Sequence, residues 1–119
     1  MTERRAKYGN TKVSIDGIVF SSKKEAVRYA ELKLLERAGK ITALKLQPSF
    51  VLAPAVVFHG GEKKRALRYV ADFAYTVEHN GDYAQVIEDV KSEATRKDKM
   101  YRVKKHLMKS VLGLDITES

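Results

Sequence analysis

The stretch that decides the fold is Tyr69–Lys91, YVADFAYTVEHNGDYAQVIEDVK. Two runs rich in β-branched and aromatic residues flank Asn80-Gly81, a pair that favours a two-residue type I′ hairpin turn. Counting back from such a turn places Asp72 directly opposite Asp89. Because side chains alternate along a strand, Lys91 falls on the same face as Asp89. The sequence therefore predicts two carboxylates and a lysine on one face of one sheet.

This juxtaposition needs a physical reason, because like charges directly opposite each other destabilise a hairpin. A hard divalent cation such as Mg²⁺, with Mn²⁺ as a substitute, would bind between two such carboxylates. A bound metal activates water and stabilises charge on a phosphate, and Lys91 would position the water, help deprotonate it, or bind the phosphate. Alternatively, Asp72 and Asp89 are simply neutralised by Lys91 and nearby arginines. We favour a site, because both aspartates lie in the most apolar strands, where unpaired charge is costly.

Composition bounds the class of protein and the kind of partner. With 119 residues the chain is long enough for one domain, residues 1–119, whose first ten residues we expect to form a flexible basic arm. The 23 Lys and Arg exceed the 15 Asp and Glu, giving a net charge of +8. Such a charge favours a polyanionic partner, for which DNA is the default, although a basic domain without one is the alternative. The absence of cysteine excludes disulfides and zinc–thiolate sites.

Hydropathy points away from the membrane. No apolar run approaches the ~18–20 residues that span a bilayer, and the N-terminus lacks the apolar core of a signal peptide. We therefore expect a cytoplasmic protein without a membrane partner.

The N-terminal third predicts a small hairpin followed by a helix. Weak alternation over residues 12–20 surrounds a turn at Asp16-Gly17. Ser21 or Ser22 then caps a helix that runs to about Ala38. Glu25 has two interpretations: it closes a capping box with Ser22, or it faces a site at the edge of the buried face.

The middle of the chain predicts strands and a basic run. Ile41–Ala53 has the pattern of a strand that is either an edge or bulged at Pro48, since proline cannot donate to a ladder. Residues 55–58 continue it towards a turn at Gly60-Gly61. The charges of Glu62–Arg68 form either a solvated edge or a phosphate-binding rim.

The C-terminal part predicts a crossover connection. Residues 92–96 are expected to form a loop, followed by a helix over Lys97–Leu112 and a strand over Leu114–Thr117. That strand would lie parallel to Tyr83–Lys91. The apolar face of this helix is predicted from four residues at helical spacing: Met100, Val103, Leu107 and Val111.

The order of these residues resembles a known nuclease pattern. Glu25 in a helix, Asp72 in a strand and Asp89-Val90-Lys91 in its partner strand are similar to the PD-(D/E)XK nuclease superfamily. More closely, a set of motifs over nearly the whole chain resembles the phage-associated DUF1064 group, regarded as Holliday-junction-resolvase-like: Tyr8-Gly9-Asn10, Asp16-Gly17, Phe20, Ser22-Lys23-Lys24-Glu25, Leu46-Gln47-Pro48, Tyr69-Val70-Ala71-Asp72-Phe73 and Glu88-Asp89-Val90-Lys91. The resemblance implies an α/β fold with a restriction-endonuclease-like αβββαβ core, a mixed sheet and flanking helices.

The resemblance also implies roles for individual residues. Glu25, Asp72 and Asp89 would be metal ligands with the Val90 carbonyl, and Lys91 the catalytic lysine. Ala71 stands where the superfamily name has proline, a residue that supplies no chemistry. Glu88 is predicted by alternation to face away from this site. Weaker candidates for DNA contact, each with a structural or solvated alternative, are Gln47, Arg65, Arg68, Lys97, Tyr101 and Lys104.

The function expected from this pattern is Mg²⁺-dependent hydrolysis of phosphodiester bonds by an endonuclease that acts on branched DNA. Paired strands in a junction imply a homodimer. The alternatives are a nuclease for nicked, linear or fork DNA, and a DNA-binding module that keeps the fold without turnover. If the chain is phage- or prophage-encoded, its location would be the bacterial host cytoplasm.

Overall fold

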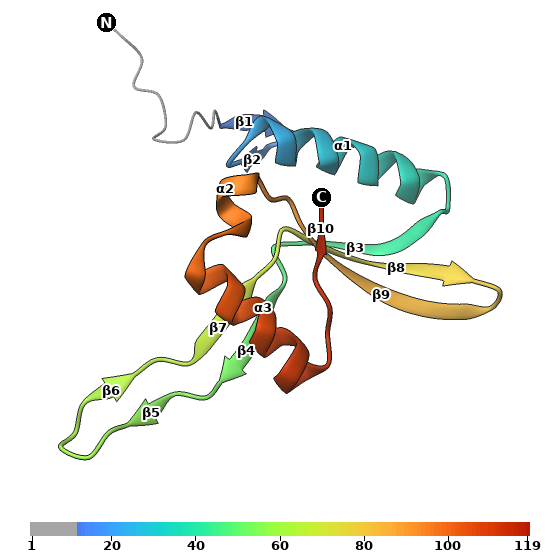
Figure 1. Cartoon of the computed structure of the whole chain (residues 1–119). Helices are drawn as coiled ribbons and strands as arrows, with labels where there is room; N and C mark the ends of the chain where they lie inside the picture. The colour runs from blue at the N-terminus through green and yellow to red at the C-terminus, as the bar shows by residue number, and fades with distance from the viewer. Residues whose placement is uncertain (1–11) are drawn as a thin grey trace, which may run out of the picture.

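A four-stranded mixed sheet forms the centre of the molecule, as shown in the computed structural model, which describes residues 12–119 (Figure 1). Its strands lie in the order β10-β9-β8-β3, with bounds Thr117–Glu118, Asp82–Asp89, Phe73–His79 and Ile41–Leu46. The fold is therefore α/β with a mixed sheet, as predicted. The basic arm predicted over residues 1–10 lies outside the described residues.

The hairpin of β8 and β9 has the predicted turn and register. Asn80 and Gly81 have positive φ values, 52° and 83°, and a type I′ turn requires a positive φ at both central positions. His79 pairs with Asp82, and the ladder continues in register to the pair of Phe73 with Glu88. Asp72 lies one residue beyond the last ladder pair.

The predicted crossover is confirmed, with shifted boundaries. The chain leaves β9 through α2 (Glu93–Arg96) and α3 (Lys99–Leu112), and β10 then pairs with β9 in parallel. The prediction of a loop over residues 92–96 was wrong, because Ser92 and Thr95 form a capping box that closes one helical turn.

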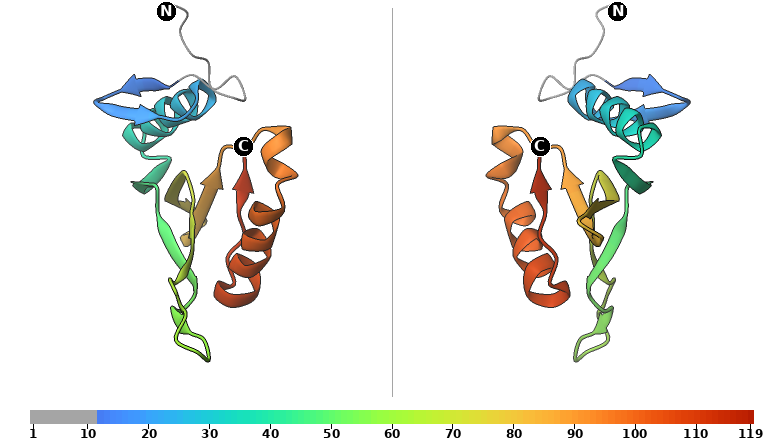
Figure 2. Two further views of the ribbon diagram at one scale, coloured as in Figure 1. Left: turned by 90° about the vertical axis from the view of Figure 1, so that its left-hand side faces the viewer. Right: turned by 90° about the vertical axis from the view of Figure 1, so that its right-hand side faces the viewer.

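Helices cover the sheet on both faces (Figures 1 and 2). On one face lies α1 (Lys23–Arg37) with the predicted small hairpin, β1 (Val13–Ile15) and β2 (Ile18–Phe20). The buried cluster between them is Phe20, Ala26, Tyr29, Leu32, Ile41, Phe73 and Tyr75. On the other face α3 closes a second cluster, formed by Leu52, Tyr69, Ala71, Ile87, Tyr101, Met108 and Ile116. No helix within residues 12–119 has both the length and the apolarity needed to cross a bilayer.

The strand predicted over Ile41–Ala53 is split in two. β3 ends at Leu46 and β4 (Ser49–Ala53) begins after Pro48, because Gln47 adopts a positive φ of 50° and Pro48 lacks an N–H. The break turns the chain out of the central sheet. The Gln47 N–H still bonds to the Asp72 carbonyl at 2.9 Å, which anchors the break beside the start of β8.

From this break the chain forms a long two-stranded ribbon, Ser49–Val70. β4 pairs with β7 (Leu67–Val70), and β5 (Val56–Val57) pairs with β6 (Lys63–Lys64). The base of the ribbon packs on α3, whereas its tip extends away from the sheet and the helices in both views (Figures 1 and 2).

The predicted apolar face of the second helix was wrong in part. Met100, Val103 and Val111 are exposed, and Leu107 is half-buried. The residues that face the core are instead Tyr101 and Met108, seven positions apart on a neighbouring stripe. Tyr101 is buried because its hydroxyl donates to Glu118 on β10, which a methionine or valine could not do. Its ring also packs 6.3 Å from the ring of Tyr69 on β7.

Candidate active site

A cavity of about 610 Å³ collects the five residues to which the sequence assigned the metal and catalytic roles. They are Glu25, Asp72, Asp89, Val90 and Lys91. Glu25 comes from the first turn of α1, Asp72 from the residue before β8, and the other three from the end of β9 and just beyond it. The remaining lining residues are Val13, Ser21, Ser22, Lys23, Lys24, Val70, Ser92 and Thr95.

Glu25 serves both the helix cap and the cavity. Ser22 caps α1 by accepting from the Glu25 N–H at 3.1 Å. The Glu25 carboxylate is directed to Ser21, whose hydroxyl donates to Oε2 at 2.7 Å. In the described part of the chain the reciprocal half of the capping box is not formed. The cap therefore fixes the backbone of Glu25, and its carboxylate faces the site. The residue as a whole is only 6% exposed.

Asp72 lies against the end of β9. The Val90 N–H donates to its Oδ2 at 2.7 Å, so the two strands are joined here through a side chain, one residue beyond the ladder. Burial raises the pKa of Asp72 to about 6, although the Val90 N–H opposes this, and repulsion from Glu25 adds to it. The raised pKa means that burial and the neighbouring Glu25 charge disfavour the ionised form of Asp72.

Asp89 is almost wholly buried and is held by two groups. The Tyr69 hydroxyl donates to Oδ2, and Lys91 Nζ lies 3.3 Å from the same oxygen. Burial raises the pKa of Asp89, the Lys91 charge offsets part of that rise, and Glu25 adds to it. Tyr69 was not recognised from the sequence as part of the site, although it opens the motif Tyr69–Phe73.

The Lys91 ammonium group packs against an aromatic ring. Its Nζ lies 4.3 Å from the ring centroid of Tyr101, a cation–π arrangement. The Tyr101 hydroxyl donates to Glu118 Oε2 at 2.5 Å, and Tyr101 is buried. Tyr101, a candidate for phosphate contact from the sequence, is thus placed beneath the lysine and not on the surface.

Glu88 faces the opposite side of the sheet, as alternation predicted. Arg28 on α1 binds its two oxygens at 2.5 and 2.9 Å, and the hydroxyls of Tyr75 and Ser119 donate at 2.7 and 2.8 Å. Burial alone would raise the pKa of Glu88, but these bonds lower it overall. Glu88 therefore joins α1, β8 and the C-terminus, and is no part of the cavity.

The donor set suits a hard divalent cation chemically. Carboxylate and carbonyl oxygens are the ligands that Mg²⁺ prefers. Among residues 12–119, Glu25 Oε1 and Asp72 Oδ1 receive no hydrogen bond, while Asp89 Oδ2 is already held by Tyr69 and Lys91. No three carboxylate or histidine side chains in this range are arranged as a ready-made metal site. An ion held here would offset the burial and the Glu25 repulsion that raise the pKa of Asp72.

Two lysines line the cavity that sequence reasoning had not assigned to it. Lys23 and Lys24 lie at the start of α1, and Lys24 Nζ donates to the Lys91 carbonyl at 2.9 Å. Both lysines belong to the motif Ser22–Glu25, in which only the capping serine and Glu25 were predicted to have a role.

The other candidates for DNA contact lie outside this cavity. Gln47 is exposed at the break between β3 and β4, and Lys97 is exposed just before α3. Lys104 is half-buried on α3. Arg65 and Arg68 are exposed along the ribbon.

Comparison with known proteins identifies the family. The family model described as "Protein of unknown function (DUF1064)" matches residues 5–114. The chain belongs to the DUF1064 family. No curated protein and no solved structure matches it significantly.

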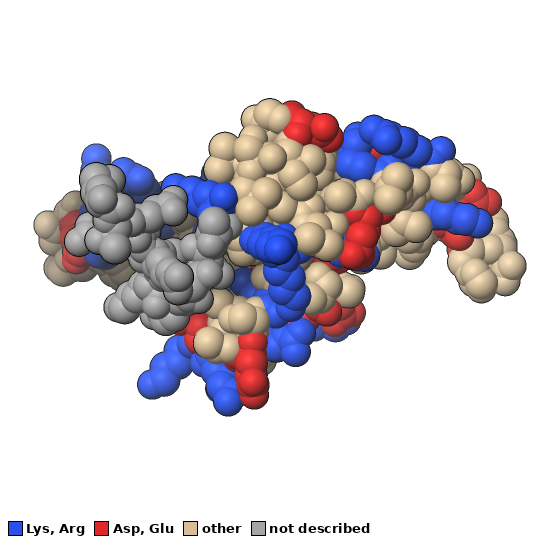
Figure 3. Space-filling view, turned by 90° about the horizontal axis from the view of Figure 1, so that it is seen from above, with Lys and Arg blue, Asp and Glu red and all other residues tan. Residues whose placement is uncertain are grey.

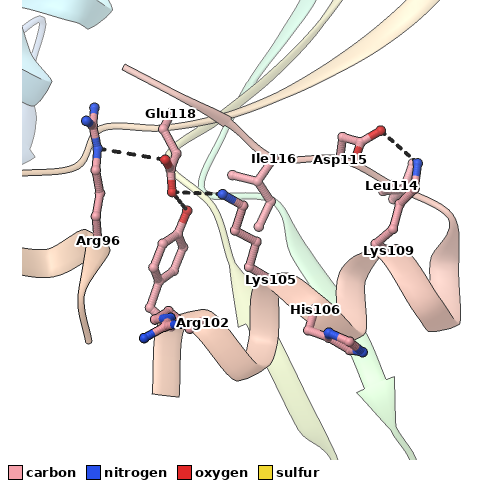
Figure 4. Close-up of a pocket in the computed structure, with 10 residues that line it drawn as sticks. Arg96, Arg102, Lys105, His106, Lys109, Leu114, Asp115, Ile116 and Glu118 are labelled. Atoms are coloured by element: carbon pink, nitrogen blue, oxygen red, sulfur yellow. Dashed lines mark hydrogen bonds and ion pairs between the residues drawn. The ribbon is translucent and has the colours of Figure 1, made fainter. Parts of the chain in front are cut away.

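The DUF1064 chain has a second cavity, of about 450 Å³, which is lined by Tyr101, by basic residues of α3 and by residues 114–118 (Figure 4). Its basic side chains are largely paired within the molecule: Lys105 and Arg96 lie 3.2 and 3.8 Å from Glu118, and Lys109 lies 2.9 Å from Asp115. Basic and acidic side chains are also interspersed on the face shown in Figure 3. The ion pairs around this cavity accordingly hold α2 and α3 against β10 and the residues just before it.

Proposed function

We propose that this DUF1064 protein is a Mg²⁺-dependent endodeoxyribonuclease with a restriction-endonuclease-like core. The observation that carries the proposal is the convergence of Glu25, Asp72, Asp89 and Lys91 at one cavity. These residues come from three separate segments of the chain.

The order of elements supports the same proposal. Leaving aside the ribbon and the two short additions (the β1–β2 hairpin and α2), the chain runs α1, β3, β8, β9, α3, β10. This is the αβββαβ order of the PD-(D/E)XK superfamily. The carboxylates lie where α1 meets the start of β8 and the end of β9, which supports the proposed core.

Each residue of the site has a distinct role in hydrolysis. Glu25, Asp72, Asp89 and the Val90 carbonyl would hold the ion, which when bound supplies activation of water and neutralisation of phosphate charge. Lys91, fixed by Asp89 and Tyr101, orients the attacking water or binds a non-bridging phosphate oxygen. Lys23 and Lys24 form a cationic rim that attracts the DNA backbone to the three acids.

Branched DNA is the substrate we propose, from the resemblance to Holliday-junction resolvases, with a homodimer cutting paired strands. Nicked, linear or fork DNA is the alternative substrate. A binding module without turnover is the alternative outside the enzymes.

A cleavage assay separates these possibilities. The protein is incubated with a four-way junction, a linear duplex and a single strand, in Mg²⁺, Mn²⁺ or EDTA. We expect metal-dependent cutting, fastest on the junction. Preferred cutting of another DNA would replace the proposed substrate, and no cutting of any of them would reject the enzyme.

Variants test whether the cavity is the active site. Asp89→Asn and Lys91→Ala should reduce cutting by at least 100-fold, an effect of the size typical for charged catalytic groups, while DNA affinity and the circular dichroism spectrum are retained. Arg37→Gln, an exposed charge change at the end of α1, should leave the rate unchanged. Equal losses in Arg37→Gln and Lys91→Ala would show that net charge, not the site, limits the reaction.

A further inference from the structure

The outer part of the ribbon, residues 54–66, is a regular arm that the site does not use. Val56 pairs with Lys64 and Val57 with Lys63, and the Phe58 N–H donates to the Glu62 carbonyl at 2.8 Å. The tip is closed by Gly60 and Gly61, whose φ values of 101° and 95° favour glycine. The arm is therefore a defined β-ribbon with a tight end, not an irregular loop.

The arm exposes apolar and cationic groups together. Val57 and Phe58 are 66% and 53% exposed. Lys63 and Arg65 are exposed without an ion-pair partner within residues 12–119, whereas Lys64 pairs with Glu62 at 3.0 Å. Excluding His59, the arm carries three cations, Lys63, Lys64 and Arg65, against the single acid Glu62. By this register Phe58 shares a face of the ribbon with Val56 and Lys64, and Lys63 and Arg65 lie on the other face. Unpaired cations and an exposed apolar side chain together suit the major groove of DNA, where phosphates flank base edges and thymine methyl groups.

The dimensions fit a groove of duplex DNA. A two-stranded β-ribbon fits the major groove of B-DNA, which is ~12 Å wide. Each edge of the ribbon has roughly ten residues between its base and its tip, which at ~3.3 Å per residue spans about 33 Å. One turn of duplex rises ~34 Å, so the tip of the ribbon lies about one turn from the base of the ribbon beside the cavity.

The base of the arm leads directly to the candidate active site. Val70 lines the cavity, and Arg68, two residues away on β7, shares its face. Arg68 is exposed, and the cations of the arm follow it outward. Arg68 thus lies between the cavity and the cations of the arm.

We propose that residues 54–66 bind the major groove of a DNA duplex about one turn from the phosphate at the cavity. The face with Phe58 is turned to the base edges at the groove floor, and Lys63 and Arg65 on the other face reach the phosphates at the groove rim. This proposal rests on the proposed function for its ligand, but binding by the arm is measured without turnover.

The test compares matched double variants on a 40-base-pair duplex in EDTA, so that no cutting occurs. Lys63→Gln with Arg65→Gln removes two arm cations; Arg37→Gln with Lys40→Gln removes two exposed cations at the end of α1 and is the control. The arm variant should bind about tenfold more weakly, and the slope of log affinity against log salt should fall by about 2. The control should bind like the wild type.

A hydroxyl-radical footprint and Phe58→Ala locate the contact. Relative to the wild type, the arm double variant should lose protection at one end of the footprint, about one turn from the centre. Phe58→Ala should weaken binding without changing the salt slope. An unchanged footprint and affinity in the arm variants would overturn the proposal.

A protein interface is the competing outcome, and sedimentation recognises it. If Phe58→Ala and the arm double variant convert a dimer to a monomer, the arm binds a second copy and the proposal fails. Failure of the nuclease function has a different signature: the wild type would not cut DNA, yet the arm-dependent affinity and footprint would persist.

Discussion

At the scale of single residues, the site is organised by what holds Lys91. The Asp89 carboxylate lies 3.3 Å from Nζ and the Tyr101 ring lies 4.3 Å below it. A free lysine has several rotatable bonds, so these two contacts restrict where the ammonium can lie. Tyr101 is therefore a positioning residue, acting on Lys91.

Tyr101 variants should separate the ring from the hydroxyl. Tyr101→Phe keeps the ring under Lys91 and should keep kcat within about threefold. Tyr101→Leu removes the cation–π contact, worth about 0.5–2 kcal/mol, and should lower kcat by roughly 3- to 30-fold with little change in KM. Steady-state cleavage kinetics measure both. A proportionate rise in KM in the leucine variant would instead indicate a role in DNA binding.

Asp72 should destabilise the metal-free fold at neutral pH. Its pKa is raised from an ordinary 3.8 to about 6, so the unfolded chain releases the proton first as the pH rises. The contribution of Asp72 to the stability of the wild type therefore falls between about pH 4 and pH 6 and stays at the lower level above. Asp72→Asn avoids this cost and should be more stable than the wild type above pH 6 in EDTA.

Urea unfolding at pH 4, 6 and 8 measures this difference. The advantage of Asp72→Asn should be small at pH 4 and largest at pH 8. An advantage that did not depend on pH would contradict the electrostatic explanation.

At the scale of elements, α1 contacts the residues of the sheet at two points that have different roles. Its N-terminus brings Glu25 into the cavity, and one turn later Arg28 binds Glu88 on the opposite face of β9. Glu88 is fully buried, so its charge requires this partner. The Arg28–Glu88 pair thus fixes the register of α1 and, with it, the position of Glu25.

Removing Arg28 should be costly. Arg28→Ala leaves the Glu88 charge buried with only hydroxyl partners, and should lower the free energy of unfolding by about 3 kcal/mol. Val27→Ala, an exposed substitution on the same turn, is the control and should cost under about 1 kcal/mol. Both are measured by urea denaturation; comparable losses in the two variants would mean that Glu88 does not depend on Arg28.

At the scale of the whole molecule, the shape is extended. The radius of gyration is 17.0 Å, against about 13 Å for a compact domain of this length. The ribbon and the β8–β9 hairpin project from a body closed by α1 and α3 (Figure 1). The body carries the candidate site, and the outer ends of the projections add surface without adding to the core.

The predicted homodimer has a surface available on α3. Met100, Val103 and Val111 form an exposed apolar stripe along its outer side, and the predicted twofold dimer would bury this stripe against its own copy. Val103→Asp should shift sedimentation from dimer to monomer. Lys97→Asp, an exposed charge change just before α3, should not. A monomeric wild type at micromolar concentration would contradict the dimer.

The sequence by itself determined the hairpin, its register and most of the site. Asn80-Gly81 imposes the turn locally, and the strict alternation of strands then places Asp72 near Asp89 and turns Glu88 away. The capping serine likewise placed Glu25 in the first turn of α1.

Only the tertiary structure decided which stripe of α3 is buried, where the long strand breaks and what holds Lys91. Several stripes of α3 were apolar enough to face the core. The stripe with Tyr101 is the buried one because Tyr101 contacts Lys91 and Glu118, which lie outside the helix. Local patterns specify turns, caps and alternation, since these depend on neighbouring residues. The face of a helix and the surroundings of a buried charge depend on contacts that only the folded chain brings together.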